Sequence, residues 1–372
     1  MQFIDLASQQ ARIKDRIDSR IQTVLAHGAY IMGPEVQELE QKLADFCGAK
    51  HVLGCANGTD ALQLALMALD IGVGDAVFVP SFTFAATAEI VPFVGATPVF
   101  VDVDSKTYNL DVNSLERAIH KARALGLRPA AVIPVDLFGL AADYLPIQKL
   151  ADAYDLKVIA DSAQGFGANY HGKCTGTLGD ITTTSFFPAK PLGCYGDGGA
   201  LTTDDDKLAE RLNSLRIHGK GREKYDNQRI GMNSRLDTIQ AAILLEKLAI
   251  YPDEILARQK TAQLYTEHLK DRFVTPHTPK NQDSIWAQYT LLAADNDRRS
   301  DNMARLKEAG IPTGIYYPLP LHQQAAYKEF PCDPEGLPVS EQLSQRAFSL
   351  PMHAYLTRDD QEKIIAALLA GN

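Results

Sequence analysis

Short apolar runs alternate with amphipathic stretches through the middle of the chain. Runs rich in β-branched residues predict seven strands, at His51–Asn57, Ala76–Thr83, Thr97–Asp104, Ala130–Phe138, Lys157–Asp161, Asp180–Phe187 and Gly199–Thr203. Helical patterns predict helices at about Pro34–Cys47, Thr59–Leu69, Ala85–Val94, Val112–Ala124 and Tyr144–Tyr154. Because the strands are almost continuously apolar and alternate with helices, they predict an α/β fold with a mostly parallel sheet covered on both faces.

The connection between the last two predicted strands differs from the others. It runs from Phe187 to Gly199 and is rich in proline and glycine. It is too short to hold a crossover helix, so these two strands are predicted to be antiparallel neighbours. The seven-stranded sheet is therefore expected to contain one antiparallel strand.

Two helices are predicted after the sheet. An apolar helix covers Asp237–Ile250 and is expected to end at Tyr251-Pro252, because proline breaks the helical hydrogen-bond pattern. A second helix runs from about Glu254 to Leu269 into a C-terminal α+β region. This break predicts a large domain at residues 1–250 and a small domain at residues 251–372.

Composition narrows the class of protein. The 372 residues carry a formal net charge of −9, whereas a nucleic-acid-binding surface is normally basic. The five cysteines are scattered without a CxxC pair, which favours reduced thiols over disulfides or a metal site. No secretory signal is visible, and no apolar run approaches the ~20 residues that span a membrane. We therefore expect a cytoplasmic protein with no nucleic-acid, membrane or metal partner.

Lys190 is the first candidate for chemistry. It lies in the sequence Ser185-Phe186-Phe187-Pro188-Ala189-Lys190-Pro191, between two prolines and apolar neighbours. A lysine amine in a partly dry pocket loses its proton near neutral pH and can form a Schiff base. The alternative is a solvated loop lysine, which is the commoner use of this residue.

Asp161 is the second candidate, because it ends an apolar run and begins the sequence Asp161-Ser162-Ala163-Gln164. A carboxylate there can keep a pyridine nitrogen protonated, which makes pyridoxal phosphate (PLP) an electron sink. Gln164 could bond the phenolic oxygen of the same cofactor. The alternative is an ordinary turn or helix cap. Asp161 and Lys190 together suggest a PLP enzyme.

A phosphate-binding turn is predicted where the first strand ends, at Ala56-Asn57-Gly58-Thr59-Asp60. Gly58 lets a phosphate approach the backbone, the helix N-terminus offers free N–H groups and Thr59 adds a hydroxyl. Ser185 could add another contact. The alternative is a plain N-cap turn. An aromatic residue of Phe82-Thr83-Phe84 could stack on a flat cofactor or belong to the core.

Six motifs in this order resemble those of the DegT/StrS family of PLP-dependent nucleotide-sugar aminotransferases, over essentially the whole chain. The motifs are Ala56-Asn57-Gly58-Thr59-Asp60-Ala61-Leu62, Asp161-Ser162-Ala163-Gln164, Ser185-Phe186-Phe187-Pro188-Ala189-Lys190, Gly196-Asp197-Gly198-Gly199, Asn233-Ser234-Arg235-Leu236-Asp237 and Tyr317-Pro318-Leu319-Pro320-Leu321-His322. The resemblance implies the type I PLP aminotransferase fold and a homodimer with active sites at the interface.

The resemblance also implies roles for single residues. Lys190 corresponds to the Schiff-base lysine, Asp161 to the partner of the pyridine nitrogen and Gln164 to a contact of the ring oxygen. The remaining cofactor contacts implied are Phe84 stacked on the ring, Gly58, Thr59 and Ser185 on the phosphate, and Asn233 on the phosphate from the neighbouring subunit.

The implied reaction transfers an amino group from glutamate to a keto-sugar nucleotide, with Lys190 as general acid and base. Its expected setting is surface polysaccharide biosynthesis, such as that of O-antigen and lipopolysaccharide. The likeness is greatest to enzymes for UDP-2-acetamido-3-keto sugars, including the glucuronates. Those tend to have His-Tyr-Pro where this chain has Tyr316-Tyr317-Pro318, and tyrosine brings no cationic form at neutral pH. A 3-keto UDP-N-acetylhexosamine is expected, with a 4-keto UDP or dTDP sugar as the alternative.

The segment from Arg216 to Arg235 is basic, which is typical of a solvated loop. Our sharper hypothesis is that part of it meets the nucleotide diphosphate, with Arg235 nearest the sugar. Tyr316, Tyr317 and His322 are further expected substrate contacts.

Three rival functions remain. A PLP-dependent sugar dehydratase of the family would have histidine in place of Lys190. A cysteine desulfurase would need an activated cysteine, and none is evident. A regulator that binds DNA is disfavoured by the acidic charge and by the lack of a recognisable helix-turn-helix segment.

Overall fold

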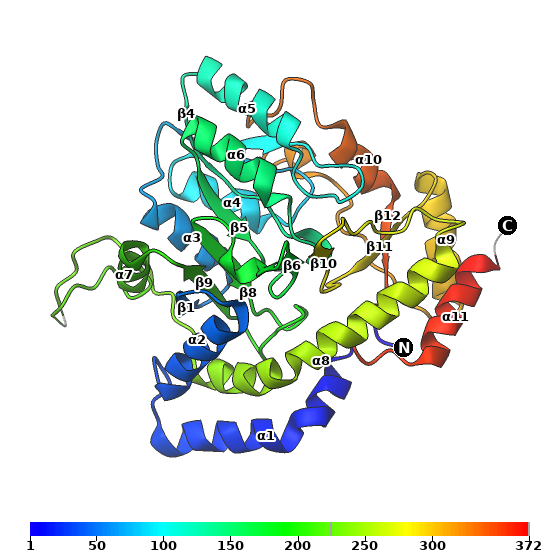
Figure 1. Ribbon diagram of the computed structural model, residues 1–372, viewed down its shortest axis with the longest axis horizontal. Coiled ribbons are helices and arrows are strands. Elements are labelled where there is room, and N and C mark those ends of the chain that lie inside the picture. The colour runs from blue at the N-terminus through cyan, green and yellow to red at the C-terminus, as the bar shows by residue number, and fades with distance from the viewer. Residues whose placement is uncertain (224, 371–372) are drawn as a thin grey trace.

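The structure is a computed structural model that describes residues 1–223 and 225–370. Its centre is a seven-stranded sheet in the order β1-β9-β8-β5-β4-β2-β3 (Figure 1). The strands are β1 (His51–Cys55), β2 (Asp75–Pro80), β3 (Thr97–Val101), β4 (Arg128–Val132), β5 (Lys157–Asp161), β8 (Ile181–Ser185) and β9 (Gly199–Thr203). All seven predicted strands are confirmed. The predicted antiparallel strand is β9, which pairs antiparallel with both β1 and β8.

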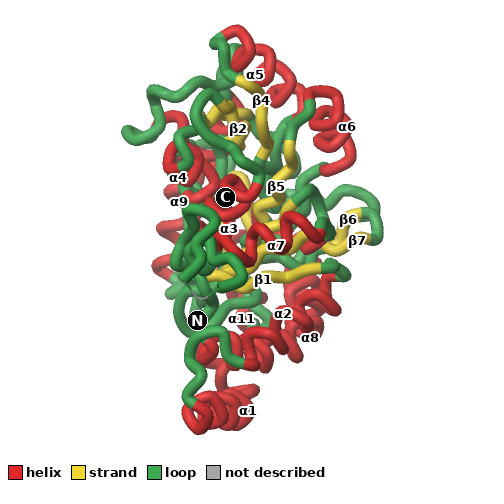
Figure 2. The backbone as a smooth tube through the Cα atoms, turned by 90° about the vertical axis from the view of Figure 1, so that its left-hand side faces the viewer, coloured by secondary structure: helices red, strands yellow, loops and turns green. Residues whose placement is uncertain are grey.

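Helices cover both faces of this sheet, as its apolar strands require. One face packs against α3 (Gly58–Ala68), α4 (Ala86–Phe93) and α7 (Asp206–Leu215). The other packs against α5 (Val112–Ala124) and α6 (Tyr144–Tyr154), and towards β1 against α2 (Pro34–Cys47). Figure 2 shows the strands between these two layers. The predicted helices are confirmed, and the bounds of α2, α5 and α6 are those predicted.

The predicted helix break at Tyr251-Pro252 is wrong. A single helix, α8 (Thr238–Leu269), continues through Pro252. Tyr251 is fully buried, its ring lies 5.7 Å from that of Phe46, and its hydroxyl donates to the carbonyl of Phe166 at 2.7 Å. This packing stabilises the helix at Pro252, which has no backbone N–H to donate to the helical hydrogen-bond pattern.

The second half of α8 leads into the C-terminal α+β region. There it packs with α9 (Asn296–Glu308), α11 (Arg358–Leu369) and the antiparallel pair β11 (Tyr289–Leu292) and β12 (Ala347–Leu350). A minor sheet joins β10 (Gln282–Asp283) to β6 (Asn169–Tyr170) and β7 (Lys173–Cys174), and α10 (Pro338–Arg346) precedes β12. Because α8 contributes to both cores, it joins the two regions through a continuous helix.

The N-terminal helix α1 (Leu6–His27) was not predicted. It lies outside α8 and packs on it where Ile13 and Ile17 meet Ile243 and Ile250 (Figure 1). Within residues 1–223 and 225–370, none of the helices combines the length and the apolar character that a membrane crossing requires.

Candidate active site

Lys190 lies in the loop between β8 and β9, beyond the end of β8. Its N–H donates to the carbonyl of Phe187 at 2.8 Å, which folds the loop back on itself. A Cβ on Gly193 would lie 2.6 Å from the same carbonyl oxygen, so only glycine fits this close approach. The side chain is partly exposed, and burial lowers the pKa of its amine while Asp161 raises it.

Asp161 ends β5 and is buried, with 5% of its surface exposed. It accepts hydrogen bonds from the hydroxyl of Thr87 at 2.9 Å and from the N–H of Ala163 at 3.1 Å. Burial raises the pKa of Asp161, whereas these two donors and the charge of Lys190 lower it. Asp161 and Lys190 therefore act on each other electrostatically, as expected for one site.

Gln164 is held from two sides. Its side-chain carbonyl accepts the N–H of Phe138 at 2.9 Å, and its amide nitrogen donates to the hydroxyl of Tyr317 at 3.0 Å. The ring of Tyr317 in turn meets the edge of the Phe82 ring at 5.9 Å. These contacts join the turn after β5 to the Tyr316-Tyr317-Pro318 segment.

The two phenylalanines after β2 have different environments. Phe82 is 1% exposed and belongs to an apolar cluster, which makes it a core residue. Phe84 is 56% exposed. The open ring of Phe84 is thus the one available to cover a flat ligand.

The predicted phosphate turn lies at the start of α3. Asn57 caps this helix by accepting the N–H of Asp60 at 2.8 Å. A Cβ on Gly58 would lie 2.7 Å from the Cβ of Ser185, so the turn and the end of β8 touch and leave no room for a side chain. The structure therefore brings Gly58, Thr59 and Ser185 to one helix N-terminus, whose free N–H groups favour an anion.

Within the basic segment, Arg216 is held by the protein and is not free to bind a ligand. Arg216 is 3% exposed and binds Glu40 at 2.5 Å and the carbonyl of Gly54 at 2.6 Å. Asn233 is exposed, and Arg235 is partly exposed. Between them Ser234 is buried and accepts the N–H of Ala56 at 3.2 Å. The end of this segment is thereby fixed to the phosphate turn.

His322 differs from the other expected substrate contacts. One of its ring nitrogens lies 2.7 Å from the hydroxyl of Ser81 and the other 3.1 Å from Glu341. With both nitrogens engaged, the ring links the end of β2 to α10. Tyr316 is partly exposed and lies next to Tyr317, with 6.0 Å between the ring centroids.

The thiols of the chain are not activated. Burial raises the pKa of Cys47 to about 11 and that of Cys194 to about 11. Cys55 is fully buried, and its pKa is also raised. These environments disfavour the cysteine desulfurase alternative.

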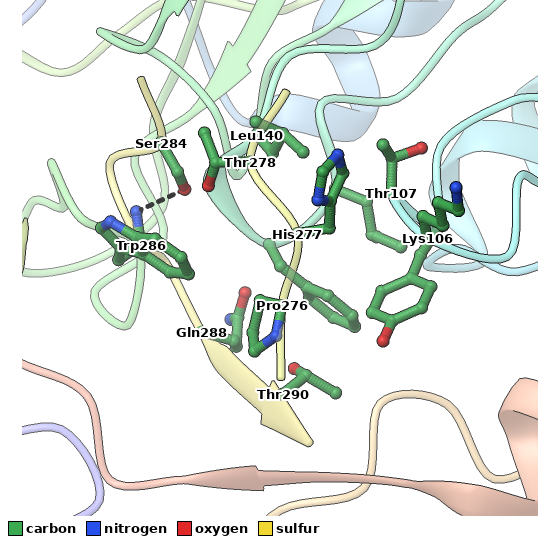
Figure 3. A pocket seen from close by; sticks show the side chains of 13 residues that line it. Lys106, Thr107, Leu140, Pro276, His277, Thr278, Ser284, Trp286, Gln288 and Thr290 are labelled. Atoms are coloured by element: carbon green, nitrogen blue, oxygen red, sulfur yellow. Dashed lines mark hydrogen bonds between the residues drawn. The ribbon is translucent and has the colours of Figure 1, made fainter. Parts of the chain in front are cut away.

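Figure 3 shows a separate pocket, lined by residues 106–108 and 137–140 on one side and by the segment that precedes β11 on the other. Its wall is mostly apolar and includes Trp286, whose N–H donates to the hydroxyl of Ser284 at 3.0 Å. Phe138 joins this wall to the candidate site, but neither Lys190 nor Asp161 lines the pocket.

Sequence reasoning missed Thr87 and Ser81. Each forms a hydrogen bond to a candidate residue that lies in a distant segment of the sequence. Thr87 comes from α4 and is 74 positions from Asp161, and Ser81 is 241 positions from His322. No local pattern marks such partners.

Comparison with known proteins gives a consistent result. Residues 11–369 match the DegT/DnrJ/EryC1/StrS aminotransferase family. The chain belongs to this family. The UDP-2-acetamido-2-deoxy-3-oxo-D-glucuronate aminotransferase of Pseudomonas aeruginosa is 51% identical to it over 369 residues, 99% of each chain.

Solved structures share the fold of this chain. A DegT DnrJ EryC1 StrS aminotransferase from Brucella abortus is 54% identical, with a TM-score of 0.98 over 100% of both chains. NtdA from Bacillus subtilis, with bound cofactor PMP, is 27% identical with a TM-score of 0.87, over 99% of this chain and 82% of that one. The predicted aminotransferase fold is confirmed.

Proposed function

We propose that the protein is a PLP-dependent aminotransferase that moves an amino group from glutamate to a UDP-2-acetamido-3-keto sugar. The observation that carries this function is the pairing of a lysine with a lowered pKa, Lys190, and a buried carboxyl, Asp161, beside an anion-binding helix N-terminus. The names of the relatives support the same class of reaction.

The residues present fit the cofactor. When bound, PLP supplies an electron sink that stabilises negative charge on the substrate carbon beside the amine. Asp161 would hold the proton on the ring nitrogen, and Gln164 would contact the ring oxygen. Phe84 would cover one face of the ring, and the N-terminus of α3 would hold the phosphate with Gly58, Thr59 and Ser185.

Lys190 would both hold the cofactor through its amine and move the proton during transfer. Burial lowers the pKa of this amine, so a larger share of it is neutral and basic at neutral pH than for a solvated lysine. A neutral amine at this position would accept a proton from the substrate carbon and donate it again later in the transfer.

The choice of acceptor depends on the residue at position 316. The Pseudomonas relative is named for a 3-oxo-glucuronate, which carries a carboxylate. Tyr316 can donate a hydrogen bond here but brings no cation at neutral pH. We therefore favour a UDP-2-acetamido-3-keto hexose without a carboxylate, in the cytoplasm and in a surface polysaccharide pathway, with 4-keto sugars as the alternative.

A homodimer would complete the site. Four apolar side chains near the site segments are about half exposed, namely Tyr30, Ile31, Phe84 and Phe187. Exposed apolar groups of this kind are typical of an interface. A second copy covering them would bring its Asn233 to the phosphate and its Arg235 to the sugar. The division into domains at residues 1–250 and 251–372 also stays a proposal, with α8 spanning both.

Absorbance tests the proposed function directly. The protein with added PLP should show a band near the visible edge that shifts when glutamate is added. The aminated form should then react with a 3-keto UDP-2-acetamido sugar and regain the original band. If only 4-keto sugars are turned over, the acceptor is a 4-keto sugar and not the 3-keto sugar proposed. If glutamate causes no spectral response, the aminotransferase activity is contradicted.

A further inference from the structure

A second buried acidic residue, Asp136, is a backbone neighbour of Asp161 at the end of the sheet. Asp136 follows β4, and its N–H donates to the carbonyl of Asp161 at 2.9 Å. Val135 and Asp161 pair in parallel at the same point of the sheet. The side chain of Asp136 is completely buried. The backbones of Asp136 and Asp161 thus lie side by side at the sheet edge where the cofactor's ring would bind, with the carboxyl of Asp161 facing α4 and that of Asp136 facing α6.

Asp136 is held by neutral donors. Its carboxyl accepts the hydroxyl of Tyr144 at 2.9 Å, the N–H of Ala142 at 2.9 Å and the hydroxyl of Ser162. Within the described part of the chain, none of its hydrogen-bond donors or ion-pair partners is a cation. A buried carboxyl without a cation binds a proton more readily than a solvated one.

These contacts connect Asp136 to both ring-contacting residues. Ser162 and Gly165 belong to the turn that carries Asp161 and Gln164, and a Cβ on Gly165 would lie 2.3 Å from that of Asp136. In the segment after β4, Asp136 lies two residues before Phe138, whose N–H donates to Gln164. Asp136 therefore supports the turn from behind.

The hydroxyl of Ser162 has two possible acceptors, which allows for both charge states. It contacts Asp136 and lies 3.1 Å from the carbonyl oxygen of Thr175. When Asp136 is ionised, Ser162 donates to it. When Asp136 is protonated, its O–H can donate to Ser162, whose hydroxyl then turns to Thr175. Both states keep their hydrogen bonds without moving the turn.

We propose that Asp136 is a positioning residue that supports the Asp161–Gln164 turn and, through its charge beside Asp161, tunes how firmly the site keeps the cofactor's ring nitrogen protonated. This inference rests on the proposed function. Because Asp136 gains and loses its proton in place, the effect depends on pH.

The groups that surround Asp136 favour a titration of its carboxyl near neutral pH. Burial raises the pKa of Asp136 to about 7, although Ser162, Ala142 and Tyr144 lower it; Asp161 adds repulsion. The other titratable groups that face Asp136 are Tyr144 from α6 and Cys174 from β7, and both have raised pKa values and stay neutral. Above pH 7 the ionised Asp136 would add negative charge beside Asp161, which favours a cationic ring.

The first test uses the full chain without cofactor. A carboxyl with a higher pKa in the folded chain than its ordinary 3.8 binds more protons when folded, so its contribution to stability is lost as pH rises through about 7. Asp136→Asn removes this loss. Its Tm relative to the wild type should rise between pH 4 and 7 and level off above 8. The exposed Asp152→Asn on α6 is the matched control and should show a constant difference.

If the Tm difference between Asp136→Asn and the wild type is also constant with pH, Asp136 does not titrate near pH 7 and the inference is wrong. If that variant does not fold, Ser162→Ala serves instead. It removes one donor from the ionised carboxyl and should move the titration of stability to higher pH. An unchanged pH dependence in Ser162→Ala would equally contradict the inference.

The second test separates the inference from the proposed function. In the PLP-bound wild type, kcat should fall about fivefold between pH 8 and pH 6, because protonation removes the charge of Asp136. In Asp136→Asn it should change less than about twofold over this range, and the pH titration of the cofactor's absorbance band should shift. If the wild type binds no PLP, the proposed function fails. If it transaminates and Asp136→Asn keeps the wild-type pH profile and spectral titration, only the inference fails.

Discussion

The two halves of the candidate site are built in different ways. The cofactor half lies at buried strand ends, where Asp161, Gln164 and Asp136 each accept or donate several fixed hydrogen bonds. The substrate half includes Arg235, which is partly exposed at the end of a charged segment. One chain thus fixes Asp161, Gln164 and Asp136 by itself, whereas Arg235 would become fully buried only against a ligand or a second copy.

The largest effect should come from removing the amine of the cofactor half. Lys190→Ala should lower kcat at least about a thousandfold, because it removes the amine proposed to move the proton. Binding of the sugar nucleotide, measured by calorimetry, should change little. If kcat and the affinity for the sugar nucleotide fall by comparable factors, the cofactor half and the substrate half do not act separately.

Asp161→Asn should have the next largest effect, about a hundredfold on kcat. The amide keeps the shape of the carboxyl and the bond from Thr87 but cannot hold a cationic ring nitrogen by charge. The absorbance spectrum with PLP should change while the fold, followed by circular dichroism, does not. Wild-type turnover in this variant would remove Asp161 from the cofactor site.

Charge reversal should affect the substrate half alone. Arg235→Glu should raise the KM for the sugar nucleotide about tenfold, with the glutamate half-reaction unchanged. Arg272→Glu, at an exposed position far along the chain, is the matched control and should leave both half-reactions unaltered. A loss confined to the glutamate half-reaction would place Arg235 in the cofactor half instead.

The smallest effect should come from Thr87→Val. It removes one hydrogen bond to Asp161 without changing the volume much, so the affinity for PLP should fall about threefold to tenfold. Fluorescence titration of PLP into the apoprotein would measure it. An unchanged affinity would show that Ala163 alone is sufficient to orient Asp161.

Features that depend on local sequence patterns could be predicted, whereas those that depend on tertiary packing could not. The strands and the helices α2 to α6 follow from local apolar patterns, and Lys190, Asp161 and Gly58 lie in short motifs at strand ends. The continuity of α8 through Pro252 depends on packing around Tyr251, which no local pattern contains. Helix α1 was missed, although Ile13, Ile17 and Val24 recur there at helical spacing.

The supporting residues of the site were beyond sequence reasoning for a different reason. Thr87 and Asp136 reach Asp161 and its turn from other elements, so only the folded sheet brings them together. The engagement of His322 by Ser81 and Glu341 is also a tertiary property. Motifs located the groups for chemistry, and the fold supplied the groups that orient them.

The central claim is that Lys190, rather than another lysine with a lowered pKa, holds the cofactor. Lys247 is the natural competitor, since it is 1% exposed and burial lowers its pKa to about 8, but its amine lies over the ring of Tyr195 at 4.3 Å. The deciding measurement is borohydride reduction of the PLP-bound protein followed by peptide mass spectrometry. We predict a pyridoxyl group on the peptide with Lys190; a label on Lys247, or on no lysine, would contradict the account.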